Sequence, residues 1–213
     1  GDNINIYELT CIPPSTVLVN DLTPNSANLY IQQNDVSQWE VLVSETTFTS
    51  ESLPETPAYR AIVNTPVVSL TGLTANTDYY YSVRAICGAN DTSDWKTINM
   101  FHTYCAAVNV PMQETFETAS STNCWSNGGE SGSVSRSTSY RRSGTASIRI
   151  EAATAVTPEF IADSLTGFMI NGWCYATSDS VDFAIGVVAD PNDPASSYEP
   201  LTTVVVPVSY QWT

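Results

Sequence analysis

The chain of 213 residues has room for one large or two ordinary domains, and 42% hydrophobic residues can supply a core for each. It carries 22 Asp and Glu against 7 Lys and Arg, a formal net charge of -15. Nucleic acids and anionic lipid surfaces are poor partners for such a chain, because both are bound through clustered cations. No apolar run approaches the roughly 18 residues of a membrane-spanning helix, so we expect no membrane insertion.

Short apolar runs predict an all-β fold. The chain is rich in Ser and Thr, a balance that favours half-exposed strands over helices. The apolar runs are separated by Asn, Asp, Gly and Pro at intervals typical of sandwiches and barrels. These runs lie at residues 17–19, 41–43, 185–188 and 204–206.

Composition divides the chain into two modules. Residues 120–147 form a Ser/Gly-rich tract, whereas strand-like segments follow one another closely in the first half. We expect an N-terminal tail at 1–10, a first domain at 11–104 and a second domain at 105–213, with little linker between the domains.

The first module has a strand pattern at residues 39–43, where side chains should alternate between the two faces of a sheet. We expect Trp39, Val41 and Val43 to point inside, and Glu40 and Leu42 to point outside.

Residues 79–85 repeat this alternation. The expected inward set is Tyr79, Tyr81, Val83 and Ala85, and the outward set is Tyr80, Ser82 and Arg84. A turn-rich segment at 73–78 precedes this strand, so the hydroxyl of Tyr79 can bond back to nearby backbone in a tyrosine-corner arrangement.

These patterns lie among further segments, which are Cys11-Ile12-Pro13-Pro14, Ser26-Ala27-Asn28-Leu29, Val67-Val68-Ser69-Leu70, Gly72-Leu73-Thr74 and Ser93-Asp94-Trp95. Together they resemble a fibronectin type III domain, which implies a β-sandwich over residues 11–104. The variant with Cys11 and Cys87 is similar to those in secreted multidomain proteins of Bacteroidetes-type bacteria. The Trp that the family usually has on its second strand falls at Ile31, and we expect Trp39 to fill that volume.

The second module carries another order of segments, which are 105–108, 114–117, 123–125, 142–148 and 172–176. This order resembles the jelly-roll domains grouped as MAM-like or cleaved-adhesin-like. Such domains normally continue for several more strands, so we expect a jelly roll that is incomplete at its C-terminus, either trimmed or completed by something else.

Three features of the second module have structural interpretations. Residues 181–188 read as a core strand, followed by a turn at 190–194. Its expected core face carries Val181, Phe183, Ile185 and Val187. Trp125 and Trp173 are interpreted as core anchors, because each lies inside a segment that carries the resemblance.

The 5 cysteines point to an oxidising compartment and therefore to a secreted or cell-surface protein. In a type III sandwich the start of the first strand and the end of the sixth lie at the same end, which implies a Cys11–Cys87 disulfide. Cys105 and Cys124 flank the first strand of the second module and form the next pair. Cys174 is left over as an inert buried thiol.

No constellation for catalysis is visible, so we expect no enzyme. His102 is the single histidine, and no nucleophile and base are paired around it in sequence. A zinc site is not expected either, since no C-x-x-C pair exists. Neighbouring acids are interpreted as solvated strand ends and turns, and these are Glu114 and Glu117, Asp179 and Asp182, and Asp190 and Asp193.

Calcium is the one cofactor that we keep as an alternative to none. Some MAM-like relatives hold such an ion, and the resemblance places the family's first-strand acid at Glu117.

Two surface clusters are candidates for ligand binding. In the first module Tyr80 is expected beside Glu40, Leu42 and Arg84, where its ring could stack on a sugar; ordinary cross-strand packing and pairing explain the same residues. In the second module 140–142 is the only basic concentration. Arg141 and Arg142 contact either an acidic glycan or the chain's own acids, and we favour the acids.

The sequence therefore predicts a non-catalytic extracellular or cell-surface module for adhesion or binding, whose ligand is a glycan or glycoprotein. The prediction of adhesion or binding rests on analogy with proteins of the same fold. One alternative is an accessory spacer region of a larger secreted enzyme, such as a peptidase or glycoside hydrolase, with catalysis elsewhere. Another is an array element that binds nothing by itself.

Overall fold

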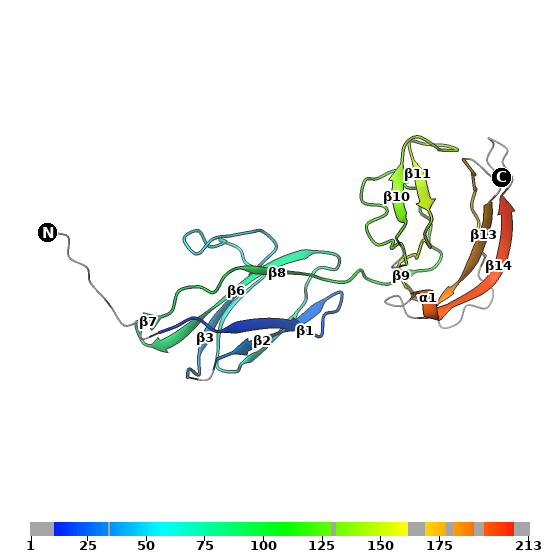
Figure 1. The fold of residues 1–213 in the computed structure, drawn as a ribbon. Coiled ribbons are helices and arrows are strands. Elements are labelled where there is room, and N and C mark those ends of the chain that lie inside the picture. The colour runs from blue at the N-terminus through cyan, green and yellow to red at the C-terminus, as the bar shows by residue number, and fades with distance from the viewer. Residues whose placement is uncertain are drawn as a thin grey trace. The chain divides into compact units, whose positions relative to one another are not determined.

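The computed structural model describes residues 11–33, 35–128, 131–161, 169–177, 181–189 and 194–206. The chain forms two compact units, 1–106 and 107–213, each of which is described by itself (Figure 1). The boundary between them lies two residues beyond the one expected from composition. The expected tail at 1–10 lies outside the described residues.

The first unit is a sandwich of two antiparallel sheets (Figure 1). One sheet has the order β1-β2-β5, with strands β1 (Thr16–Asn20), β2 (Ser26–Gln32) and β5 (Val67–Thr71). The other has the order β4-β3-β6-β7, with strands β4 (Tyr59–Val63), β3 (Trp39–Ser44), β6 (Asp78–Gly88) and β7 (Asp91–Thr92). Strand β8 (Asn99–His102) also pairs with β6.

The hydrophobic core lies between these two sheets and confirms the inward set expected for β6, whereas Ser82 of the expected outward set is also buried, at 1% exposed. Tyr79, Tyr81, Val83 and Ala85 are all buried in one cluster. Trp39 and Ile31 lie in that same cluster, from opposite sheets. The core of the first unit is therefore built from the inward faces of both sheets, as period-two patterning predicts.

Strand β3 differs from its expected pattern, because both of its faces are buried. Leu42 and Glu40 lie outside the core cluster, on the outward face as expected, but they are 0% and 9% exposed, so that face is covered and does not meet solvent. The segment that follows β3 explains the difference: Phe48 is buried, and Glu51 lines a depression together with Arg84 on the outer face of the sheet. This segment folds back over the sheet, which alternation within β3 alone does not reveal.

The tyrosine corner is confirmed at the start of β6. The backbone N–H of Thr74 donates a 2.8 Å hydrogen bond to the Tyr79 hydroxyl, which in turn donates a 3.0 Å bond to the Glu45 carboxylate. Gly72 and Asn76 adopt positive φ angles of 72° and 51° on either side of Thr74. The hydroxyl of a buried ring thus fixes the turn that leads into β6.

The second unit has three two-stranded sheets among its described residues (Figure 1). Strand β9 (Val108–Asn109) pairs in parallel with β12 (Phe160–Ile161), and β10 (Ser133–Ser137) pairs antiparallel with β11 (Ser147–Glu151). Strand β13 (Val181–Val188) pairs antiparallel with β14 (Tyr198–Val206), and the one-turn helix α1 (Pro194–Ser197) lies between them. The all-β class is confirmed, whereas the jelly roll and its incompleteness remain predictions.

Strand β13 has the bounds expected from the sequence, and its expected core face is partly covered. Phe183, Ile185 and Val187 are half-buried, whereas Val181 is 48% exposed. Alternation shows which face of a strand is apolar, but it does not show whether another layer covers that face. The expected turn at 190–194 falls mostly on residues outside the described part.

No helix in the described part of either unit is long and apolar enough to cross a membrane.

Candidate functional site

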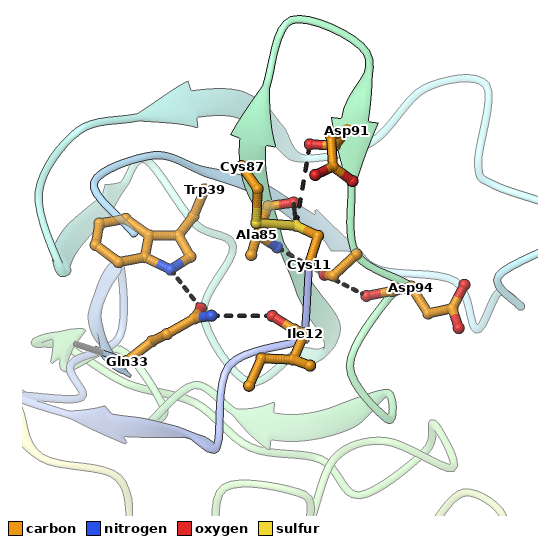
Figure 2. The surroundings of a disulfide bond; sticks show 9 residues. Cys11, Ile12, Gln33, Trp39, Ala85, Cys87, Asp91 and Asp94 are labelled. Carbon is orange, nitrogen blue, oxygen red and sulfur yellow. Dashed lines mark hydrogen bonds between the residues drawn. A yellow bond between two sulfur atoms is a disulfide. The ribbon is translucent and has the colours of Figure 1, made fainter. Parts of the chain in front are cut away.

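The Cys11–Cys87 disulfide is confirmed and ties the segment before β1 to the end of β6, with the two Cα atoms 5.7 Å apart (Figure 2). Both sulfur atoms and a carboxylate oxygen of Asp91 lie within 4.8 Å of one another. Metals bind thiolates, however, and an oxidised sulfur is not a thiolate. These three residues therefore form no metal site in the oxidised protein.

Beside the disulfide, Gln33 lies between Trp39 and the N-terminal segment (Figure 2). The indole Nε1 of Trp39 donates a 3.0 Å bond to the Gln33 side chain, whose amide donates a 2.9 Å bond to the carbonyl of Ile12. The only polar atom of this buried Trp side chain is thereby satisfied, and the segment before β1 is held against the sandwich.

The predicted pairing of Cys105 and Cys124 is also confirmed. Cys174 is a free, half-buried thiol, and burial raises its pKa. A raised pKa lowers the thiolate fraction at neutral pH, which supports the interpretation of Cys174 as an unreactive thiol.

Three charged side chains of the first unit form a closed group on the outer face of the β4-β3-β6 sheet. Glu40 accepts hydrogen bonds from Arg60 Nε at 2.9 Å and from Arg84 Nε at 2.7 Å. Burial alone would raise the pKa of Glu40, but the two guanidinium groups outweigh it and hold the pKa below its ordinary value of 4.5. Glu40 thus stays ionised at neutral pH and pairs with both arginines, whose two positive charges share its single negative charge.

An open depression of about 560 Å³ borders this group. Its lining residues are Ser50, Glu51, Arg84, Thr92, Ser93, Asp94 and Trp95. The Arg84 guanidinium lies 4.8 Å from the centre of the Trp95 ring. No sequence pattern signals this contact, because the pairing of β6 with β7 brings the two residues together from opposite sides of a turn.

The predicted sugar-stacking cluster of the first module is not brought together. Glu40 and Arg84 are paired, but Tyr80 lies farther along β6, opposite Ser44 and Met100. Its side chain is half-buried and is not part of the depression. Ligand binding by Tyr80 stays a prediction.

His102 lies on β8 and is exposed, as a strand position between Phe101 and Thr103 implies. Its Nδ1 is 2.7 Å from Asp78 Oδ1, and its Nε2 is 3.0 Å from Asn76 Oδ1. Both ring nitrogens therefore face side-chain oxygens, and within the described residues no hydroxyl or thiol bonds to this ring. The group is a surface hydrogen-bond cluster without a nucleophile.

The second unit holds a face built from two stacked pairs. The Arg142 guanidinium lies 3.6 Å from the centre of the Trp173 ring. The rings of Tyr140 and Tyr175 stack with centres 5.5 Å apart and planes at 26°. Two segments far apart in sequence therefore meet through their aromatic side chains. We call this set, with Arg141 between the pairs in sequence, the aromatic–arginine face.

Two aromatic rings of this face are exposed to solvent. Trp173 is 55% exposed and Tyr140 is 42% exposed, so the interpretation of Trp173 as a core anchor was wrong. The Trp173 ring contacts Arg142 and leaves much of its surface to solvent. Trp125, the other expected anchor, is half-buried and packs edge-on against Phe116, with ring centres 5.5 Å apart.

Among the described residues, the arginines of the face have no acidic partner, so their predicted pairing with the chain's own acids stays a prediction. Arg141 donates a 2.6 Å bond to the carbonyl of Thr138, and no salt bridge joins Arg141 or Arg142 to a carboxylate of the described residues. Glu151 of the same unit forms a 2.6 Å ion pair with Arg149.

Glu117, the predicted calcium ligand, holds a loop. Its carboxylate accepts a 2.8 Å bond from the backbone N–H of Thr145 and a 2.5 Å bond from the hydroxyl of the same residue, and these bonds lower the pKa of Glu117. A Cβ at Gly144, where φ is 66°, would collide with this carboxylate. Among the described residues no group of three potential metal ligands includes Glu117. Calcium binding stays a prediction.

No protein-family model matches this chain, and no curated protein matches it either. Solved structures similar to it include the FN5 domain of Drosophila Lar, with 16% identity and a TM-score of 0.37 over 46% of this chain and 100% of that chain. The fn3 domain of the human collagen alpha-1(XX) chain has 22% identity and a TM-score of 0.38 over 46% of this chain and 89% of that one. A two-domain fibronectin type III segment of chicken tenascin has 20% identity and a TM-score of 0.35, covering 42% of this chain and 49% of that one.

The two sheets of the first unit, β1-β2-β5 and β4-β3-β6 with β7 and β8, form the β-sandwich that the sequence resemblance implied for this module. The resemblance of the second module to MAM-like domains and the bacterial origin remain predictions.

Proposed function

We propose that this chain is a non-catalytic binding region of a secreted or cell-surface protein. In it the first unit is a rigid spacer, and the second unit adheres to a glycan or a glycoprotein. The single observation that carries the proposal is the exposure of Trp173 and Tyr140 on one face, where large aromatic rings would otherwise be buried.

The two disulfides fit an extracellular location. Such bonds persist in oxidising compartments and are rare in the reducing cytosol. Cys87 is exposed to solvent, so its bond with Cys11 would meet cytosolic reductants directly. The confirmed bonds therefore support secretion or display at the cell surface.

The spacer role of the first unit is supported by how its polar groups are used. Arg60 and Arg84 are bound to Glu40, and the hydroxyl of Tyr79 is bound on both sides. Groups that already have partners gain little from a ligand, because a new bond must replace an old one. This unit is better suited to holding shape than to recognition.

The binding role of the second unit is supported by ring geometry. The C–H face of a sugar stacks on an exposed aromatic ring, and neighbouring polar groups take its hydroxyls. Tyr140 is held by its stack with Tyr175, and Trp173 is held by Arg142. The rings are thus fixed before binding, which reduces the entropy cost of association.

A second candidate function is an accessory spacer within a larger secreted enzyme, such as a peptidase or glycoside hydrolase. The polar side chains of the first unit that were described above already have partners within that unit. This favours the spacer function, because a spacer needs no ligand. In that case the isolated chain binds no glycan, and the chemistry belongs to a domain outside it.

The test is a screen of the intact chain on an array of neutral and acidic glycans and glycoproteins. We expect binding that Trp173→Ala weakens at least about tenfold, while Tyr104→Ala, which removes a ring that is also 55% exposed from the first unit, leaves it unchanged. Thermal melts of both variants check that they fold. An intact chain that binds nothing on the array would overturn the proposal and favour the spacer.

A further inference from the structure

The Arg142 guanidinium stacks with one face on the Trp173 ring, and its N–H edge has no hydrogen-bond partner among the described residues. It lies 3.6 Å from the centre of the Trp173 ring, and no described residue accepts a hydrogen bond from it. A guanidinium carries five N–H donors in a planar fork, whose edge matches the two oxygens of a carboxylate. Stacking on the ring fixes the plane of the fork and leaves that edge for another molecule.

Arg141 adds a second cation with donors to spare. One of its nitrogens, Nη1, bonds to the carbonyl of Thr138, which is neutral and leaves the charge unbalanced. The chain has 22 acidic residues against 7 basic ones, so an arginine without an acidic partner is unexpected. Within the described residues Glu117 binds Thr145 and Glu151 binds Arg149, so these carboxylates are engaged elsewhere. Two cations that are adjacent in sequence, neither with a carboxylate partner among the described residues, are therefore candidates for binding an external anion.

The rings beside these cations add an apolar surface. Trp173, on which Arg142 stacks, is 55% exposed, and Tyr140, which precedes Arg141 in the sequence, is 42% exposed. A matching ligand needs a C–H face to stack on the rings and an anionic group to bind the arginines. A sugar that bears a carboxylate has both groups. Resting on the binding function proposed above, we infer that the aromatic–arginine face takes carboxylated sugars, with Arg142 and Arg141 binding the carboxylate.

The charge of the whole chain limits which acidic sugars fit. A net charge of -15 repels anions at long range, although salt screens this repulsion beyond about 8 Å at physiological ionic strength. A densely sulfated polymer is much longer than this screening length, so its sulfates also come close to acidic residues of the chain and are repelled by them. A short sugar with isolated carboxylates meets chiefly the two arginines, so it is the preferred class.

The experiment measures binding of oligogalacturonate, its methyl ester and heparin to the intact chain by isothermal titration calorimetry. The methyl ester keeps the sugar and removes the charge, and heparin supplies dense sulfate. The variants are Arg142→Met and Arg141→Met, which keep an apolar stem, and Trp173→Ala. The matched control is Arg149→Met, which removes the same charge from an exposed arginine of the same unit that is paired with Glu151.

We expect oligogalacturonate to bind, and the methyl ester and heparin to bind at least about tenfold more weakly. Arg142→Met should cost about tenfold or more and Arg141→Met somewhat less, while Arg149→Met leaves affinity within about twofold. Equal binding of acid and ester, or full affinity in Arg142→Met, would overturn the inference and leave the binding function standing. Absence of oligogalacturonate binding would overturn it too, and array binding to neutral glycans or glycoproteins would then show that only the ligand class was wrong.

Discussion

Each unit contains an arginine stacked on a tryptophan, but the two arginines differ in exposure and in their carboxylate partners. In the first unit Arg84 lies over Trp95 and is bound to Glu40, and its side chain is 28% exposed. In the second unit Arg142 lies over the more exposed Trp173 without a carboxylate partner among the described residues. An arginine on a tryptophan is therefore not a binding site by itself. What distinguishes the two pairs is whether the arginine has a carboxylate partner among the described residues of its unit.

The same contrast extends to the packing of each unit. The first buries a continuous core between two sheets, and even the outer side of β3 is covered. In the second, the apolar side chains of β13 are mostly only half-buried, and Leu201, Val204 and Val205 of β14 are exposed. Substitutions should therefore have large effects on stability in the first unit and small ones in the second.

The largest expected effect comes from the Cys11–Cys87 disulfide. It joins residues 76 positions apart, and in the chain-entropy model its loss costs about 4 kcal/mol in free energy of unfolding. We expect the double variant Cys11→Ala with Cys87→Ala to show much faster hydrogen exchange in β6 peptides. Exchange in β13 peptides should change little.

The control for this experiment is Cys174→Ser, which removes the free thiol of the second unit. It should leave exchange in β6 unchanged. Equal acceleration of hydrogen exchange in β6 and β13 peptides of the double variant would show that the two units do not differ in stability as proposed.

Next in size is a pair of leucines. Leu42 is fully buried on β3, so Leu42→Ala should cost about 3 kcal/mol in free energy of unfolding. Leu201 on β14 is 63% exposed, so Leu201→Ala should change it by no more than about 0.5 kcal/mol. Chemical denaturation of the two variants measures both. Similar losses would mean that β14 is covered in solution.

A smaller effect is expected at Glu40. Glu40→Gln removes the charge that Arg60 and Arg84 share, and should cost about 1 to 2 kcal/mol in free energy of unfolding at pH 7. The pKa of Glu40 is lowered by folding, so this stabilisation is present above the ordinary pKa of 4.5 and is lost as pH falls through the folded value.

The difference in unfolding free energy between wild type and Glu40→Gln should therefore shrink as pH falls below about 4.5. Denaturation curves at pH 7, 5, 4 and 3 measure it. A difference that stays constant across this range would show that the Glu40 group does not stabilise the first unit through its charge.

Much of the first unit could be predicted from sequence because its determinants are local or topological. The alternation of Tyr79, Tyr81 and Val83 gives the buried face of β6 directly. The Cys11–Cys87 pair follows once a type III sandwich is recognised, since that topology brings the two ends together. The covering of Leu42 could not be predicted, because it depends on where the following segment folds.

The candidate site was predicted only in part. The basic concentration at Arg141 and Arg142 was visible as a composition signal, but Trp173 was interpreted as a core residue. Its contact with Arg142 joins segments whose pairing no local pattern reports. The Ser/Gly-rich tract of this unit weakens periodic signals, so burial here could not be inferred from alternation.

The most direct test of the central claim is hydroxyl-radical footprinting of the intact chain with and without oligogalacturonate. We predict rapid oxidation of Trp173 and Met169, both exposed, and slow oxidation of buried Trp39. The sugar should protect Trp173 and leave Trp95 unchanged. Slow oxidation of Trp173 in the free chain, or protection of Trp95 instead, would contradict the assignment of binding to the second unit.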